Sequence, residues 1–186
     1  MELFTSRLHL RPFTKKDFIA VHSYASDPLN VKYTLFGPNS PKETKQFILR
    51  TIELSKDIPR HNYDFILEKL DDGRVIGAIS LSLRTTDEAE IGWILHRDYW
   101  NNGYTTEAAW RLIEFGFSEL PLHRIYSRCN RENIGSWRVM EKCHMIKEAC
   151  FRQVRKLRSE PNGRWYDEYQ YSILEEDYMH LKDKFI

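Results

Sequence analysis

The residues best suited to chemistry lie in one stretch, Glu90–Ala109, which has the pattern of a strand, a short polar turn and the start of a helix. The first backbone N–H groups of such a helix have no acceptor within the helix and point toward one place. The helix macrodipole adds about half a positive charge there, and Gly103 has no side chain to keep an anion away. We therefore expect a phosphate or pyrophosphate site on backbone amides. Its residues are Asn101, Asn102, Gly103, Tyr104, Thr105 and Thr106.

The turn alone leaves a second interpretation open, because many strand-to-helix turns contain glycine and bind nothing. Thr105 also places a β-branched side chain close to the expected anion, although its backbone N–H can still donate. The turn can therefore act as a binding site only if the neighbouring strands and helices hold it in place.

The chain before the turn predicts three consecutive antiparallel strands. Tyr63–Leu70 and Arg74–Leu83 are rich in β-branched and aromatic residues, and an Asp-Asp-Gly turn joins them. Thr86 and Asp87 then turn the chain into the strand that carries Glu90. This strand should be the central one.

Two helices and a first strand are expected nearer the N-terminus. Leu8–Phe13 alternates like a half-buried strand, and Thr14 with Asp17 can cap a helix that stops at Asp27-Pro28. A second helix should begin at Pro41. Its expected buried face is Phe47, Ile48, Thr51 and Ile52. The loop between these helices is either packed irregular structure or a substrate lid.

The chain after the turn predicts a largely buried helix up to Pro121, then a strand over Arg124–Cys129. Asn133 should cap a short helix with Ile134, Trp137 and Met140 on one side, after which His144 takes the left-handed conformation. Met145–Val154 and Trp165–Leu174 read as a terminal hairpin. Its basic residues are a solvated strand face or a patch for an anionic ligand. They are Lys147, Arg152, Arg155, Lys156, Arg158 and Arg164.

Composition favours one domain over residues 1–186, since 186 residues with 41% hydrophobic content suit one core better than two. The net charge of +1 predicts no nucleic-acid partner and no attraction to a membrane. No uncharged run is long enough to cross a bilayer. The three cysteines show no disulfide or zinc spacing, and the seven histidines no metal spacing, so we expect no metal and a cytoplasmic location.

Three segments together resemble the GNAT acyltransferase superfamily, and more narrowly its ribosomal-protein-alanine N-acetyltransferase-like (Rim-type) branch. They are Glu90–Leu95, Tyr99–Ala108 and Asn133–Lys142, supported by an opening Thr5–Phe13 segment and a closing Asp167–Leu174 strand. The chain departs from the family pattern at Trp100 and Thr105 in the phosphate turn and at His144-Met145, where the family has Gly-Phe.

The resemblance implies a single-domain α/β (α+β) fold with a mixed, mostly antiparallel sheet whose central strands splay apart. It also implies acetyl-CoA as cosubstrate, with the pantetheine arm along Trp93 and Leu95 and in contact with Asn133. A backbone N–H near Leu95 can stabilise the developing oxyanion. Ser136 matches the position proposed to protonate the leaving thiolate. Asn133 can also be a plain N-cap, and Ser136 a plain first-turn serine.

The base is expected to be Glu90, acting directly or through water, with Glu88 as the alternative. A carboxylate at this place on a strand can also be merely solvated or ion-paired.

The hypothesis that follows is acetyl transfer from acetyl-CoA to a primary amine by direct attack. The acceptor is a protein N-terminus or a small amine, and many relatives are dimers, which makes a homodimer one of the expected states. The alternatives are a non-catalytic CoA-binding sensor or scaffold and a nucleotide-binding domain.

Overall fold

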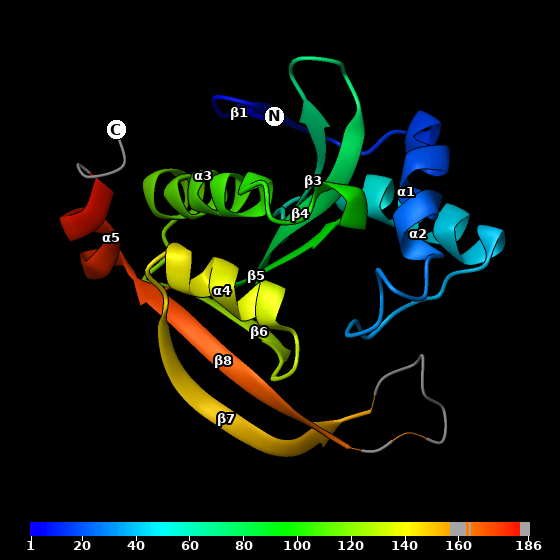
Figure 1. Cartoon of the computed structure of the whole chain (residues 1–186). Helices are drawn as coiled ribbons and strands as arrows, with labels where there is room; N and C mark the ends of the chain where they lie inside the picture. Colours follow the sequence, from blue (N-terminus) through cyan, green and yellow to red (C-terminus); the bar gives the residue numbers. More distant parts are fainter. Residues whose placement is uncertain (157–162, 164, 183–186) are drawn as a thin grey trace.

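The computed structural model describes residues 1–156, 163 and 165–182, and its framework is one eight-stranded sheet (Figure 1). The strand order is β1-β2-β3-β4-β5-β6-β8-β7. The strands are β1 (Leu3–Phe4), β2 (Leu8–Arg11), β3 (Asn62–Lys69), β4 (Val75–Leu83), β5 (Glu88–Leu95), β6 (Arg124–Asn130), β7 (Ile146–Arg155) and β8 (Tyr166–Leu174). Only the β5–β6 pair is parallel, so the sheet is mixed and mostly antiparallel, as predicted.

Five α-helices accompany the sheet in the described part of the chain. They are α1 (Phe18–Ala25), α2 (Pro41–Leu54), α3 (Tyr104–Glu119), α4 (Ile134–Lys142) and α5 (Glu175–Leu181). None of the helices in the described ranges is both long and apolar enough to span a membrane.

Capping hydrogen bonds within the first turn mark the starts of the first two helical segments. Ahead of α2, the Ser40 hydroxyl accepts from the Glu43 N–H (3.3 Å) and the Glu43 carboxylate accepts from the Ser40 N–H (2.8 Å), which is a complete capping box. Asp17 likewise accepts from the Thr14 N–H at 2.7 Å at the start of the first helical segment. The predicted cap formed by Thr14 and Asp17 and the predicted helix start at Pro41 are therefore confirmed.

The two faces of the sheet carry different helices, because side chains alternate along each strand. Odd-numbered residues of β3, β4 and β5, such as Phe65, Leu81 and Ile91, are buried in the larger core together with Leu112 of α3. Even-numbered residues such as Ile66 join the smaller core with α1 and α2. Helix α3 and helices α1 and α2 lie on either side of the central strands in Figure 1.

Strands β5 and β6 are paired over three residues only. Glu88, Ala89 and Glu90 lie opposite Arg124, Ile125 and Tyr126, in that order. Beyond this point β5 continues to Leu95 and β6 to Asn130 without pairing to each other. The predicted splay is thus present, and it opens toward the phosphate turn.

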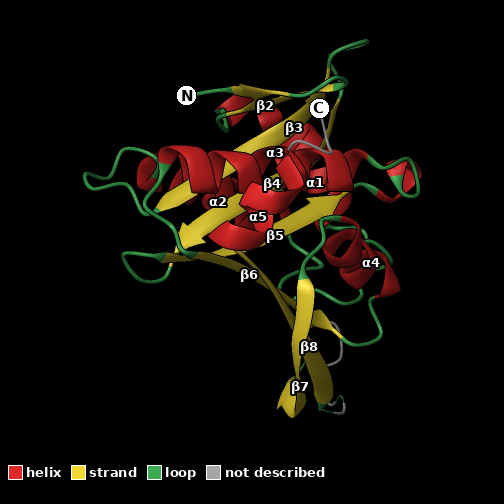
Figure 2. Ribbon diagram, turned by 90° about the vertical axis from the view of Figure 1, so that its left-hand side faces the viewer, coloured by secondary structure: helices red, strands yellow, loops and turns green. Residues whose placement is uncertain are grey.

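The C-terminal part differs from expectation in two respects. The terminal hairpin is present, but β8 lies between β6 and β7, and the hairpin projects from the body of the molecule (Figure 2). A final helix, α5, follows β8 and was not predicted. The expected turn around 160–163, with Arg158 and Arg164, lies outside the described residues except for Gly163. His144 has φ 55°, as predicted.

Two predicted buried faces are partly wrong. Phe47 of α2 is 45% exposed and Ile134 of α4 is 61% exposed, whereas Ile48 and Met140 are buried. Phe47 borders a cavity, so it is covered on one side only. Hydrophobic periodicity cannot distinguish a residue in the core from one at the rim of a cavity.

The close approach of β4 and β5 depends on Gly77. A Cβ atom at this position would lie 2.3 Å from the carbonyl oxygen of Ile94, on the neighbouring strand. We expect Gly77→Ala to lower the free energy of unfolding by about 1–3 kcal/mol, as over-packing does. Gly92→Ala is the matched control in β5, because its Cβ would meet only the Ser80 hydroxyl at 3.6 Å. Urea unfolding that ranks the two variants equally would contradict this account.

Candidate functional site

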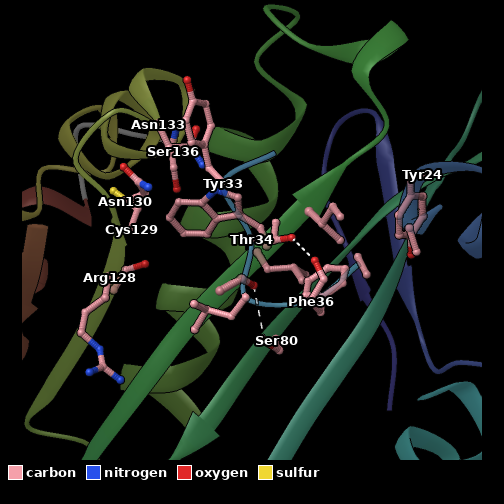
Figure 3. A pocket seen from close by; sticks show the side chains of 18 of the residues that line it. Tyr24, Tyr33, Thr34, Phe36, Ser80, Arg128, Cys129, Asn130, Asn133 and Ser136 are labelled. Atoms are coloured by element: carbon pink, nitrogen blue, oxygen red, sulfur yellow. Dashed lines mark hydrogen bonds between the residues drawn. The ribbon is translucent and has the colours of Figure 1, made fainter. Parts of the chain in front are cut away.

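A cavity of about 610 Å³ fills the opening between β5 and β6. Gly92, Trp93 and Ile94 line it from β5, and Ser127–Asn130 line it from β6. Asn133 and Ser136 of α4 close one end, and residues of α1, α2 and β3 close the other (Figure 3). The cavity therefore brings together elements from all parts of the chain.

The phosphate turn connects β5 to α3, as the sequence predicts. Asn101 (φ 62°) and Gly103 (φ 79°) are left-handed, and Gly103 is the N-cap of α3. The first helical bond runs from the Glu107 N–H to the Gly103 carbonyl at 3.0 Å. The amides of Tyr104, Thr105 and Thr106 therefore have no acceptor within the helix and can bind an anion.

The β-branched side chain of Thr105 could obstruct an anion in the turn only if it pointed toward the anion. Thr105 is buried and belongs to the packed side of α3, whereas Asn101, Asn102 and Gly103 are exposed. The backbone of the turn is thus accessible.

A clamp from the N-terminus holds the turn. The Arg7 guanidinium donates to the Asn102 carbonyl (3.0 Å) and to the Glu107 carboxylate (2.6 Å), and the Ser6 hydroxyl also donates to Glu107 (3.1 Å). Burial acts to raise the pKa of Glu107, but the hydrogen bonds from Thr5, Arg7 and Ser6 outweigh it, so the pKa lies below its ordinary value. Glu107, expected only to support the helix dipole, also ties the first residues to α3.

The backbone of β5 presents alternate peptide groups to the splay. The His96 N–H bonds the Ile76 carbonyl on the β4 side (2.8 Å), so the peptide groups of Leu95 and Trp93 point the other way. The Trp100 indole donates to the Leu95 carbonyl at 2.9 Å from that side. The amide N–H of Leu95 therefore faces the splay, next to a carbonyl that already has a donor.

Asn133 and Ser136 lie together at the start of α4. The Asn133 side chain accepts from the Ser136 N–H at 3.3 Å, so Asn133 is the predicted N-cap, and both residues line the cavity. Burial raises the pKa of the neighbouring Cys129 thiol to about 12, which a hydrogen bond with Ser136 only partly offsets. Cys129 is therefore a neutral thiol at physiological pH.

Asn130 of β6 also lines this end of the cavity. Its side-chain oxygen accepts from the Glu132 N–H (2.8 Å), while its buried amide nitrogen has no hydrogen-bond partner in the described residues. No sequence pattern predicts this role for Asn130.

Glu90 lies at the last paired position of β5, at the vertex of the splay. Its carboxylate accepts from Arg84 (2.6 Å) and Arg128 (3.1 Å) and also from the Tyr126 hydroxyl (3.4 Å). These donors occupy the lone pairs of the carboxylate, and the cavity lining does not include Glu90. Glu88, the alternative base, is paired with Arg124.

Another carboxylate, Asp64 of β3, does line the cavity, and sequence reasoning missed it. It lies in one cross-strand row with Ser80 and Gly92, so all three share a face of the sheet. Burial raises the pKa of Asp64, and the charge of Arg60 opposes this only in part. Its position in the alternating pattern of a β-strand resembles that of an ordinary solvent-facing residue, so periodicity does not distinguish it.

The loop between α1 and α2 is packed irregular structure, the first of the two predicted alternatives, and it also borders the cavity. Val31 is fully buried, and the Asn30 side chain accepts from the Arg97 N–H at 2.7 Å, so the base of the loop is packed. Tyr33, Thr34 and Phe36 line the cavity (Figure 3). The loop is thus a packed wall of the site.

Comparison with known proteins identifies the family to which the chain is similar. Residues 7–146 match the model of the acetyltransferase (GNAT) domain. The N-acetyltransferase YnaD of Bacillus subtilis is 37% identical over 179 residues, which is 96% of this chain and 99% of the relative.

Solved structures agree with this match. An acetyltransferase of the GNAT family from Bacillus anthracis is 34% identical with a TM-score of 0.82, over 95% of this chain and 99% of the other. The fold is shared with RimL, a ribosomal L7/L12 protein acetyltransferase in complex with coenzyme A (18% identity, TM-score 0.82, 95% and 99% covered). It is also shared with a spermidine N-acetyltransferase from Vibrio cholerae in complex with CoA and spermine (22% identity, TM-score 0.79, 94% and 99% covered).

Proposed function

Because the chain belongs to the GNAT family of acetyl-CoA-dependent N-acetyltransferases, we propose that it acetylates a primary amine that enters the splay between β5 and β6. The observation that carries this proposal is the end of β5–β6 pairing after Glu90, which leaves peptide groups of β5 directed at a cavity. The acceptor is a protein N-terminus or a small amine. Both acceptor classes occur among proteins of this fold, as RimL and the spermidine acetyltransferase show.

The cosubstrate would be held mainly by the main chain. We assign its pyrophosphate to the amides of Asn101–Thr106, where left-handed turns and the start of α3 direct N–H groups outward. Trp93 and Leu95 would bind the pantetheine arm through the β5 edge, and Asn133 would contact it from α4. The unpartnered amide of Asn130 adds a donor on the β6 side.

The reaction requires a neutral amine, a polarised carbonyl and a protonated leaving group. The amine nitrogen forms a bond to the acetyl carbon, and the carbon–sulfur bond breaks. The amine loses one proton, and the leaving sulfur gains one, so the protons balance. The Leu95 N–H, which faces the splay, would stabilise the negative charge that develops on the acyl oxygen. Acetyl-CoA supplies the activated acyl group.

Two side chains would carry the protons. Glu90 is proposed as the base, and because it does not line the cavity it would act through water. Ser136 is proposed to protonate the thiolate, beside the neutral thiol of Cys129. We also propose that the protein is cytoplasmic and forms a homodimer.

Coenzyme binding tests the proposed main-chain site. Gly103→Val should raise the Kd for CoA about tenfold or more, because a β-branched residue at φ 79° strains the turn and displaces its amides. Isothermal calorimetry with CoA and mass spectrometry of acetylated spermidine and N-terminal peptides provide the readouts. Gly73→Ala is the control, since Gly73 is also left-handed (φ 68°) but lies in the β3–β4 turn.

Two results would count against the main-chain site: no heat with CoA for the wild type, or equal Kd values for wild type and Gly103→Val. A wild type that binds CoA and acetylates no amine of either class would instead support the sensor alternative.

The base assignment predicts a pH-dependent defect. Glu90→Gln should leave the Kd for CoA unchanged and lower kcat/KM roughly 100-fold at low pH, where the amine is protonated, with little effect at high pH. Glu88→Gln tests the alternative base, which is also ion-paired on β5, and should show no such defect if Glu90 is the base. If the kcat/KM profile of Glu90→Gln over pH matches the wild type, Glu90 only holds Arg84 and Arg128 in place.

Ser136→Ala tests the proton donor. We expect kcat to fall roughly tenfold, near the low end for a positioned acid because the thiolate leaves fairly well unaided, with the affinity for CoA unchanged. Ser136→Thr keeps the hydroxyl and should retain most of the activity. Steady-state kinetics with acetyl-CoA measures both variants. An unaltered kcat for Ser136→Ala would show that Ser136 is a first-turn helix residue without a role in proton transfer.

A further inference from the structure

Asp64 is the unusual group of the cavity. Its side chain is half-buried and lines the cavity, the charge of Arg60 acts on it, and in the described residues nothing donates a hydrogen bond to it. Carboxylates that are partly removed from water are normally hydrogen-bonded, since desolvating an ionised group is costly. The carboxylate of Asp64 is therefore available to accept a hydrogen bond from a cationic ligand in the cavity.

The other acidic residues of the cavity are already engaged. Glu168 accepts from Arg155 at 2.7 Å, and its other oxygen, which has no hydrogen-bond donor in the described residues, is ion-paired with Arg128 at 3.7 Å. Asp167 accepts from Arg131 at 3.2 Å, and Glu43 accepts from Ser40 at 2.8 Å. Asp64 differs from all three in that no described residue donates a hydrogen bond to either of its carboxylate oxygens. A cationic ligand in this cavity would thus be directed to one carboxylate.

The surroundings of Asp64 suit a cation with an apolar body. Phe13, Tyr24 and Phe47 line the same end of the cavity, and aromatic faces attract cations. The hydroxyl of Tyr24 is buried and has no hydrogen-bond partner in the described residues. It is a second polar group at this end that the chain itself leaves unsatisfied.

Small residues connect this end to the splay. Asp64, Ser80 and Gly92 form one row across β3, β4 and β5, so two strand spacings, or about 10 Å, separate the backbones of Asp64 and Gly92. Neither Ser80 nor Gly92 has a side chain that would obstruct a chain lying over this row. An acceptor can therefore extend from the edge of β5 to Asp64.

We propose that Asp64 binds a second cationic group of the acceptor, so that the preferred acceptor is an amine carrying another positive charge about two strand spacings from the reacting nitrogen. The inference rests on the proposed function for the direction of the reacting amine. It adds a specificity-determining carboxylate that lies on β3, away from the splay.

Binding of two amines to the CoA-saturated protein tests this proposal. The probes are cadaverine, a linear diamine, and pentylamine, the monoamine with the same carbon chain, and calorimetry gives each Kd. The wild type should bind cadaverine roughly 10- to 100-fold more tightly than pentylamine, as expected for a hydrogen bond to a charged group. Asp64→Asn should remove this preference and leave the Kd for pentylamine unchanged.

Asp71→Asn is the matched control, because it removes the same charge from an exposed turn outside the cavity lining. It should keep the preference for cadaverine. Equal affinities of the wild type for the two amines, a preference that persists in Asp64→Asn, or an equal loss for both amines would each overturn the proposal. Acetylation is a separate readout: tight, Asp64-dependent binding of cadaverine without transfer would contradict the proposed function and leave the cation site standing.

Thermal melting confirms that the variant is folded. Burial raises the pKa of Asp64, so the ionised carboxylate weakens the fold at pH values above its folded pKa, and this cost disappears as the pH falls below the unfolded value. Asp64→Asn should therefore melt at or above the wild-type temperature at neutral pH, and the difference should shrink toward acid pH. Weaker amine binding together with an equal or higher melting temperature excludes misfolding as the cause.

Discussion

The divergence of β5 from β6 after Glu90 and Tyr126 is the constraint on which the rest of the structure depends. Continued pairing would satisfy the peptide groups of both strands within the protein. Divergence leaves those of Trp93 and Leu95 facing the splay, and Trp93 lines the cavity there, so a ligand can take the place of the missing strand. The ion pairs between Glu90 and the arginines Arg84 and Arg128 lie at the vertex and hold the two strands at the point where they part.

The divergence alone would not make a site, because helices normally cover both faces of such a sheet. On the face of α1 and α2, the row formed by Asp64, Ser80 and Gly92 carries small side chains next to one half-buried carboxylate. Large side chains there would fill the space, as Ile66 does in the neighbouring row. The cavity therefore results from a splayed strand pair combined with small residues on the strands beside it.

The sequence predicted the parts of the molecule whose signals are local. Ser40 and Glu43 cap α2 and Gly103 caps α3 within a few residues, and the predicted starts of these two helices are confirmed. Asp64 gave no signal, because its role depends on Ser80 and Gly92, which only sheet pairing brings beside it. The exposed Phe47, the extra helix α5 and the position of β8 between β6 and β7 depend in the same way on tertiary packing, which periodicity does not encode.

One end of the proposed site is formed by main-chain groups and the other by side chains, and this difference determines which part of the site can change between family members. In the proposed site the cosubstrate end relies on main-chain amides, which almost any residue supplies, so Thr105 can occupy the phosphate turn because its side chain is packed away. The acceptor end relies on side chains from α1, α2 and β3. Substitution there alters which amine fits without disturbing the turn. Proteins of this fold can therefore share acetyl-CoA and still act on acceptors as unlike as a ribosomal protein and spermidine, and the acceptor of this chain must be sought in the chemistry around Asp64.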